Sequence, residues 1–373
     1  MPDRSYLSWP FFEADHRAFA ERIGEWSGAH CRADERSEYE AVAAYARELG
    51  SAGFLESLRT LDVRTICLTR EALAYNDALA DFAFAMQGLG SAPVSLFGTD
   101  GQRASLLDGI VAGTTIGAFA LSEREAGSDV AATATTARRD GGTYVIDGEK
   151  TWISNAGIAG SYIVFARTSP DGAKGLSAFV VPANTAGLSI TKQIETISPH
   201  PLGTLRFENV VVPAASLIGG EGQGFKIAMA TLDVFRATVG AAALGFARRA
   251  LDETIRHVRE RKLFGEPLAS MQLTQAAIAE MATRIDAAAL LVYRAAWTKD
   301  RGAERITREA AMAKWNATET AAYVADRAVQ LFGGRGVTRG EIVERIYRDV
   351  RALRIYEGAS EIQQVVIARS VLG

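Results

Sequence analysis

Apolar residues recur every three or four positions between residues 11 and about 113, as Phe19, Ile23 and Trp26 illustrate. This spacing places them on one face of an α-helix. The stretch Ser91-Ala92-Pro93 interrupts the pattern with residues that favour turns. The first third of the chain is therefore predicted to be helical, with one helix ending at this interruption.

The pattern changes near residue 117, where short runs of β-branched and aromatic residues replace the helical spacing. The runs 144–146 and 151–153 surround Asp147-Gly148, a pair typical of a type I′ hairpin turn. Further runs of this kind cover residues 162–166, 176–181 and 205–212. The middle hundred residues are predicted to form an antiparallel β-barrel or sandwich.

Helical spacing returns after the glycine-rich turn 219–224. Long alanine-rich patterns begin near Gly224, after Pro267, and at 306–332 and 341–351. Amphipathic helices of this length bury their apolar stripes by packing together, which favours a bundle. We therefore predict an α+β multidomain fold: an N-terminal helical domain (1–115), a central antiparallel β-barrel (116–217) and a C-terminal four-helix bundle (218–373).

Composition narrows the possible functions. Of the 373 residues 48% are hydrophobic and 23% charged, the balance of a soluble globular protein, and the net charge of −3 gives no general affinity for nucleic acid or anionic membranes. Cys31 and Cys67 are too few for a disulfide framework, and four isolated histidines make structural zinc improbable. The N-terminus lacks a signal-peptide core. We expect a cytoplasmic protein without a membrane span, a nucleic-acid partner or a metal.

Several common catalytic motifs are absent from the sequence. No GxGxxG follows a predicted strand, so a Rossmann nicotinamide site is not expected. The chain also has no Gly-Lys pair for a P-loop and no GxSxG for a serine hydrolase.

Four segments remain as candidates. Residues 120–130 form a turn rich in Gly, Ser and Asp, which could hold a polar ligand or be an ordinary turn. Trp152 to Asn155 offer an indole beside a hydroxyl, which could lie against an aromatic cofactor, although a core tryptophan is the simpler interpretation. Glycines at 333–336 could admit a ligand or end a helix. Glu357, before the last predicted helix, could be a base or a partner of the helix dipole.

In this order the segments resemble the acyl-CoA dehydrogenase family of flavoenzymes. The resemblance runs from about residue 11 to the C-terminus, and its signatures are Leu121-Ser122-Glu123 to Gly127-Ser128-Asp129 and Gln330 to Gly334 continuing to Ile355-Tyr356-Glu357-Gly358. It implies bound FAD, a homotetramer, and α,β-dehydrogenation of an acyl-CoA thioester, in which a base takes the α-proton while the β-hydrogen leaves as hydride to flavin N5.

The resemblance assigns the base to Glu357. Relatives with the base on a bundle helix carry it just before the Arg of a Leu-Asp-x-x-Arg segment, and here that residue is Phe235, which cannot take a proton. Asp233 and Arg236 match positions near the thioester and pantetheine, as do Ser128 and Gly358. From the residues alone, Asp233 and Arg236 could equally be a surface ion pair.

The resemblance also assigns the FAD contacts. Arg261, Phe264 and Gln272 match positions that reach the FAD of a neighbouring subunit, so one chain would hold an incomplete site. The remaining FAD positions are Phe119, Leu121, Ser122, Gly127, Ser128, Trp152, Ile153 and Ser154 on the flavin and pyrophosphate side, and Gln330, Leu331, Gly333, Gly334, Ala359 and Glu361 on the adenosine side.

Some positions depart from the family pattern. Ala359 and Leu263 replace frequent threonines, which removes two hydrogen bonds to FAD, and His200-Pro201-Leu202-Gly203 replaces a commoner Gly-Arg-containing turn. The alternatives to an acyl-CoA dehydrogenase are a flavin oxidase, a flavin monooxygenase, a dehydrogenase of acyl-carrier-protein thioesters and a non-catalytic binding protein. Electron-transfer flavoprotein is the acceptor that the family implies.

Overall fold

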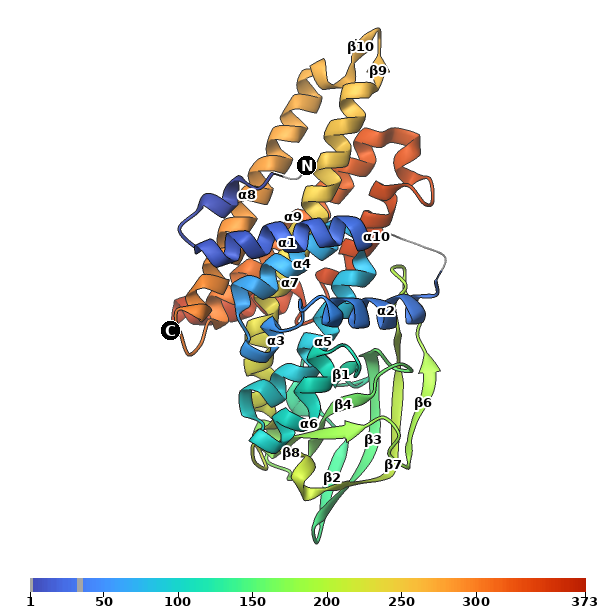
Figure 1. The fold of residues 1–373 in the computed structure, drawn as a ribbon, viewed down its shortest axis with the longest axis vertical. Coiled ribbons are helices and arrows are strands. Elements are labelled where there is room, and N and C mark those ends of the chain that lie inside the picture. Colours follow the sequence, from blue (N-terminus) through green and yellow to red (C-terminus); the bar gives the residue numbers. More distant parts are fainter. Residues whose placement is uncertain (1–2, 32–35) are drawn as a thin grey trace. The chain divides into compact units, whose positions relative to one another are not determined.

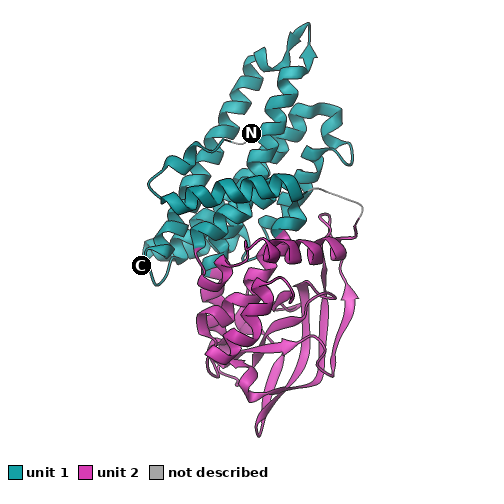
Figure 2. Cartoon of the chain, viewed as in Figure 1, with its two compact units in different colours: residues 1–33, 63–81, 233–373 teal, residues 34–62, 82–232 magenta. Residues whose placement is uncertain are grey.

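The computed structural model describes residues 3–31 and 36–373. These residues form two compact units (Figure 2). Unit 1 contains the described part of residues 1–33 together with 63–81 and 233–373, and unit 2 contains the described part of 34–62 together with 82–232. Along the chain, helices are followed by a sheet and then by helices again (Figure 1), which confirms the predicted fold class. The three domain boundaries stay a prediction.

The first third of the chain is helical, as predicted. The helices α2 and α6 each begin with a capping box, in which Ser37 pairs with Glu40 and Thr99 with Gln102, so the free amides of the first turn are satisfied. The helices are α1 (Ala14–His30), α2 (Glu38–Ser51), α3 (Ser57–Thr60), α4 (Val63–Asn76), α5 (Ala78–Phe97) and α6 (Asp100–Val111).

The interruption predicted at Ser91-Ala92-Pro93 is wrong, because these residues lie inside α5. Pro93 cannot donate a backbone hydrogen bond. The side chain of Ser91 donates to the carbonyl oxygens of Gln87 and Gly88. Phe84, Leu89 and Val94 of the same helix are buried, so packing outweighs the local preference for a turn.

Unit 2 contains an eight-stranded sheet with the order β6-β7-β3-β2-β4-β5-β8, and β1 pairs with β4 outside this path. Most pairings are antiparallel, as predicted, but β1 and β2 each pair with β4 in parallel. The strands are β1 (Gly117–Ala120), β2 (Thr136–Asp140), β3 (Thr143–Ser154), β4 (Ser161–Arg167), β5 (Leu176–Pro182), β6 (Leu188–Gln193), β7 (Leu202–Pro213) and β8 (Leu217–Ile218).

The hairpin predicted at Asp147-Gly148 is wrong, because β3 runs through both residues. Its register against β7 shifts between Ile146 and Gly148, and Gly148 has a φ of 145°, which favours glycine. The pair is a bulge. The two-residue turn lies instead at Gly141-Gly142, where Asp140 of β2 pairs with Thr143 of β3.

The sheet is buried on both faces along its central strands. In β4, Val164 belongs to one hydrophobic cluster, whereas Ile163 and Phe165 belong to a second, since neighbouring side chains of a strand point to opposite faces. The second cluster includes Leu107 and Ile110 of α6. Burial on both faces explains why this strand is a continuous apolar run in the sequence.

The last third contains the four predicted helices, α7 (Gly224–Glu260), α8 (Gln272–Asp300), α9 (Thr307–Phe332) and α10 (Ile342–Leu353), followed by α11 (Ser360–Leu372). Short strands β9 (Lys262–Leu263) and β10 (Glu266–Pro267) form a hairpin between α7 and α8. Helix α7 is long and apolar enough to cross a membrane, but its most apolar segment is mostly buried inside the protein, as in a core helix.

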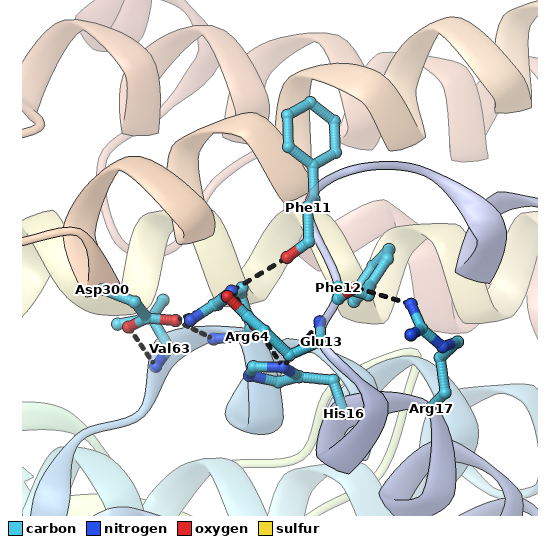
Figure 3. A network of polar contacts seen from close by, with 8 residues as sticks. All are labelled: Phe11, Phe12, Glu13, His16, Arg17, Val63, Arg64 and Asp300. Carbon is cyan, nitrogen blue, oxygen red and sulfur yellow. Dashed lines mark hydrogen bonds and ion pairs between the residues drawn. The ribbon is translucent and has the colours of Figure 1, made fainter.

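A buried arginine joins three segments of unit 1 (Figure 3). Arg64 of α4 forms an ion pair with Glu13, donates to the carbonyl of Phe11 and lies 2.8 Å from the Asp300 carboxylate at the end of α8. The Asp300 carboxylate also accepts hydrogen bonds from the backbone amides of Val63 and Arg64, at 2.9 and 3.0 Å. Asp300 thus caps the start of α4 from another helix.

Candidate active site

In unit 2, a buried ion pair fixes the first candidate segment. The Nζ atom of Lys150 on β3 lies 2.7 Å from the Glu123 carboxylate and donates to the carbonyl of Leu121 at 2.9 Å. The carboxylate also accepts hydrogen bonds from the backbone amides of Ala134 and Thr135. Burial lowers the pKa of Lys150 to about 8. Burial acts to raise the pKa of Glu123, but the charge of Lys150 and the hydrogen bonds to the carboxylate outweigh it, so this pKa is lowered. Sequence analysis did not single out Lys150.

The exposed part of this segment is open. Gly127 and Ser128 are exposed, and no atom lies within 4 Å of the Cβ position that a side chain at Gly127 would occupy. Ser122 is half-buried, and its carbonyl accepts the amide of Thr151 on β3. Phe119 packs its ring 4.9 Å from that of Phe165. The segment therefore presents hydroxyl and backbone groups to solvent, while the Lys150–Glu123 ion pair holds its buried part in place.

Trp152 lies on β3 at a second irregularity, where the register against β7 shifts between Lys150 and Ile153. Its φ is 60°, a left-handed conformation that is rare for a bulky residue, and its side chain is 59% exposed. The core-tryptophan interpretation is therefore wrong. Ile153 is buried and Ser154 is half-buried. An indole held outward by irregular backbone suits the flat ring system of a flavin.

In unit 1, Glu357 lies on the loop between α10 and α11. It has a φ of 54°, and its Oε2 atom is buried without a hydrogen-bond partner among the described residues. Burial is the largest influence on this carboxyl group and raises its pKa, while the nearby cations Arg70, Lys314 and Arg236 oppose this shift. An unpartnered buried carboxyl oxygen is costly to maintain, which makes Glu357 a candidate for contact with a ligand.

Three side chains hold the backbone next to this carboxyl group. Arg236 Nε and Gln363 Nε2 donate to the carbonyl of Glu357 at 3.3 and 3.2 Å. Lys314 Nζ and Gln363 Nε2 donate to the carbonyl of Gly358 at 2.7 and 2.8 Å. Gly358 has a φ of 90°, which favours glycine, and a Cβ atom there would lie 2.6 Å from the Gln363 amide nitrogen and displace that side chain.

Asp233 and Arg236 form a buried pair rather than a surface one. Their exposed fractions are 8% and 6%, and the Arg236 guanidinium lies 3.4 Å from the Asp233 carboxylate. The hydroxyl of Thr307 donates to the other Asp233 oxygen at 2.6 Å. The surface interpretation is wrong, because one charged turn of α7 faces the loop that carries Glu357.

Sequence analysis missed Lys314 and Gln363, although the helical spacing around Lys314 could have revealed it. Lys314 stands on the stripe of Ala310, Ala317 and Ala321, which the helical period places on the buried side of α9. A lysine at such a position needs a buried partner. Gln363 follows Glu357 by six residues and has no comparable signal.

The remaining predicted residues of unit 1 lie at the β9–β10 hairpin and near the ends of helices. Arg261 and Gln272 flank the hairpin and are exposed, and Phe264, in its turn, is 97% exposed with a φ of 54°. Gln330, Gly333 and Gly334 at the end of α9 are exposed, Leu331 and Ala359 are half-buried, and Glu361 in the first turn of α11 is exposed. The structure gathers Glu357, Asp233, Arg236 and Gly358, but it does not bring the hairpin residues to them.

Comparison with known families identifies both the strand-rich middle of the chain and its helical last third. The acyl-CoA dehydrogenase middle domain matches residues 118–210, and the acyl-CoA dehydrogenase C-terminal domain matches residues 222–372. A probable acyl-CoA dehydrogenase of Mycobacterium tuberculosis is 38% identical over 366 residues, which are 95% of this chain and 93% of the relative. The chain belongs to the acyl-CoA dehydrogenase family.

Members of this family are similar to the chain in structure as well. Butyryl-CoA dehydrogenase from Megasphaera elsdenii has a TM-score of 0.90 and 33% identity, and the match covers 97% of this chain and 99% of that one. In sequence, an acryloyl-CoA reductase (NADH) of Anaerotignum propionicum is 46% identical to the protein, in a match that covers 74% of this chain and 71% of the relative. The protein is thus an oxidoreductase of a flavoprotein family.

Proposed function

We propose that the protein is an FAD-dependent acyl-CoA dehydrogenase that converts an acyl-CoA thioester to the 2-enoyl-CoA, with Glu357 as the α-proton base. The observation that carries this proposal is the half-buried Glu357, which is held in left-handed backbone and whose Oε2 atom is buried without a hydrogen-bond partner among the described residues. A general base needs a pKa near the operating pH, and burial raises the pKa of this group in that direction.

The residues around Glu357 have distinct tasks in this proposal. Glu357 accepts the proton from the α-carbon. Gly358 lets the backbone come close to the thioester. Arg236, oriented by Asp233, holds the carbonyl of Glu357 and so keeps the base in place. Ser128 and the Asp233–Arg236 pair are further candidates for contacts with the acyl-CoA.

The residues present fit FAD. In unit 2, the exposed Trp152 and the open turn at Gly127 and Ser128 would hold the flavin and pyrophosphate, together with Phe119, Leu121, Ser122, Ile153 and Ser154. In unit 1, the exposed glycines after Gln330 and Leu331, with Ala359 and Glu361, would hold the adenosine part, since backbone at Gly333 and Gly334 has open space around it. FAD, when bound, supplies the two-electron acceptor that takes the β-hydrogen as hydride.

Glu357→Gln tests the base. The variant is expected to bind FAD and acyl-CoA but to reduce the rate of anaerobic flavin bleaching by about 10²- to 10⁴-fold, the usual contribution of a general base. Glu304→Gln makes the same chemical change on an exposed loop and should bleach at the wild-type rate. Normal bleaching in Glu357→Gln would mean that another residue is the base.

A panel of short, medium, branched and aromatic acyl-CoAs, tested together with acyl-carrier-protein thioesters, identifies the substrate.

The similarity to an acryloyl-CoA reductase makes reduction of an enoyl-CoA a second candidate. In that direction protonated Glu357 would return its proton to the α-carbon, so the same residue serves both reactions. Mixing the chemically reduced protein with enoyl-CoA measures this direction. Reoxidation by enoyl-CoA at a rate well above bleaching by acyl-CoA would favour the reductase.

The family further suggests electron-transfer flavoprotein as the electron acceptor, a homotetramer arranged as a dimer of dimers, and a cytoplasmic location. In this proposal Arg261, Phe264 and Gln272 belong to the FAD site of a neighbouring subunit. Their exposure at the hairpin between α7 and α8 supports that role, because exposed aromatic and arginine side chains favour contacts between chains.

A further inference from the structure

Lys314 is a completely buried lysine beside the proposed base. It lies on α9, its exposed fraction is 0%, and its Nζ atom donates to the carbonyl of Gly358 at 2.7 Å. Burying an ammonium group is costly unless something compensates it. Gln363 already donates to the same carbonyl, so this hydrogen bond alone does not require a charged side chain.

Three cations surround Glu357, and two of them are neutralised. Arg70 of α4 binds the Asp81 carboxylate at 2.8 Å through two nitrogens, and Arg236 pairs with Asp233. Lys314 has no carboxylate within ion-pair distance in residues 3–31 and 36–373. Its positive charge is therefore the least compensated of the three.

Other charged groups act on this pair from the neighbouring helices. Glu319 on α9 and Glu361 on α11 influence Lys314, but Glu319 is bound by Arg354 and by the hydroxyl of Ser360. Asp81 and Arg70 act on both Glu357 and the Tyr356 phenol. Burial lowers the pKa of Lys314 to about 8, so the group is still mostly protonated at neutral pH.

We infer that Lys314 is a positioning residue for the proposed reaction: its ammonium group holds the Gly358 carbonyl and, through its uncompensated charge, favours the ionised form of the Glu357 carboxyl group. This inference rests on Glu357 as the base. Without the charge, the buried carboxyl group would hold its proton to a higher pH, and less of the protein would carry a base able to accept the α-proton.

Two substitutions separate the charge from the hydrogen bond. Lys314→Met removes both in a side chain of similar length, while Gln363 still satisfies the Gly358 carbonyl. Lys314→Gln removes the charge but keeps a donor. Lys299→Met is the matched control, because Lys299 also donates to loop carbonyls, those of Ala303 and Glu304, at a site without Glu357.

Both Lys314 variants are expected to move the acid limb of the kcat/KM profile to higher pH by about one pH unit or more, because the loss of a nearby positive charge raises the pKa of a carboxyl group. Lys299→Met should leave the profile in place. A second measurement does not depend on turnover. The infrared band of the protonated Glu357 carboxyl group, assigned because Glu357→Gln removes it, should titrate at a higher pH in Lys314→Met than in the wild type.

The outcomes distinguish the two proposals. If Glu357→Gln bleaches normally, Glu357 is not the base and the proposed mechanism fails. If Glu357→Gln is inactive but both Lys314 variants keep the wild-type acid limb and infrared midpoint, only the role of Lys314 fails. A fall in kcat without either pH shift would also overturn it, since a merely structural lysine would produce that result.

Discussion

At the scale of single residues, the backbone marks the candidate site. Six described non-glycine residues have left-handed backbone, and three of them, Trp152, Phe264 and Glu357, are among the site residues predicted from the sequence. This conformation costs an L-residue about 1–2 kcal/mol. Such strain persists where the surrounding structure enforces it, and it is concentrated at functional positions. We therefore expect the side chains at these positions to serve a role other than stability.

Position 357 allows the strain to be measured. Glu357→Ala and Glu357→Gly both remove the base, but only glycine adopts a φ of 54° without penalty. The Gly variant is expected to be more stable than the Ala variant by about 1 kcal/mol in urea unfolding. Ala322→Gly, in the middle of α9, should show the opposite sign. Equal stability of the two variants at 357 would mean that the loop adapts without cost.

At the scale of elements, strand β3 organises unit 2. It pairs with β2 and β7, carries Trp152, and reaches across to the 121–123 segment through Lys150 and the amide of Thr151. The segment that would hold the flavin depends on these contacts for its position, since it belongs to no strand itself.

Lys150→Met tests this dependence. The substitution leaves the Glu123 carboxylate buried without its cation, which typically costs about 3 to 5 kcal/mol. We expect a lower thermal midpoint and a loss of flavin during gel filtration. Lys192→Met, on the exposed strand β6, should change neither. Full flavin retention in a destabilised Lys150→Met protein would show that the 121–123 segment holds its shape alone.

Element boundaries show what the sequence could and could not predict. The long helices and the strands at 162–166, 176–181 and 205–212 were found because periodic patterns report burial directly. The hairpin predicted at Asp147-Gly148 was wrong because a bulge and a tight turn both use glycine with positive φ. The interruption predicted at Pro93 was wrong because the buried contacts of α5 outweigh the local preference for a turn. Lys150 was missed because isolated buried and exposed lysines look alike in sequence.

At the scale of the whole molecule, the most exposed aromatic residue of the described chain is far from Glu357 along the sequence. Phe264 is 97% exposed at the β9–β10 hairpin, and Leu273 nearby is 86% exposed. Large apolar side chains so placed favour contact with another chain. In the proposed function that chain is a second copy, which supplies Arg261, Phe264 and Gln272 to its neighbour.

Phe264→Ser tests the assembly. Burying a phenylalanine contributes about 1.5–3 kcal/mol, so the substitution should weaken association by about tenfold or more and lower the flavin content of dilute protein. Light scattering against concentration and the visible flavin band measure the two effects. Val211→Ser, at an exposed position of β7, should affect neither. Unchanged mass together with unchanged flavin content would exclude the hairpin from the assembly.

The length of α7 has a consequence for which changes this protein tolerates. The helix ends at Glu260, which is 24 residues or about 36 Å of helix after Arg236, the residue that holds the Glu357 loop. Deleting one residue there would turn the hairpin by about 100° around the helix axis. Substitutions at exposed positions of this stretch should therefore accumulate during evolution, whereas insertions and deletions should be rejected.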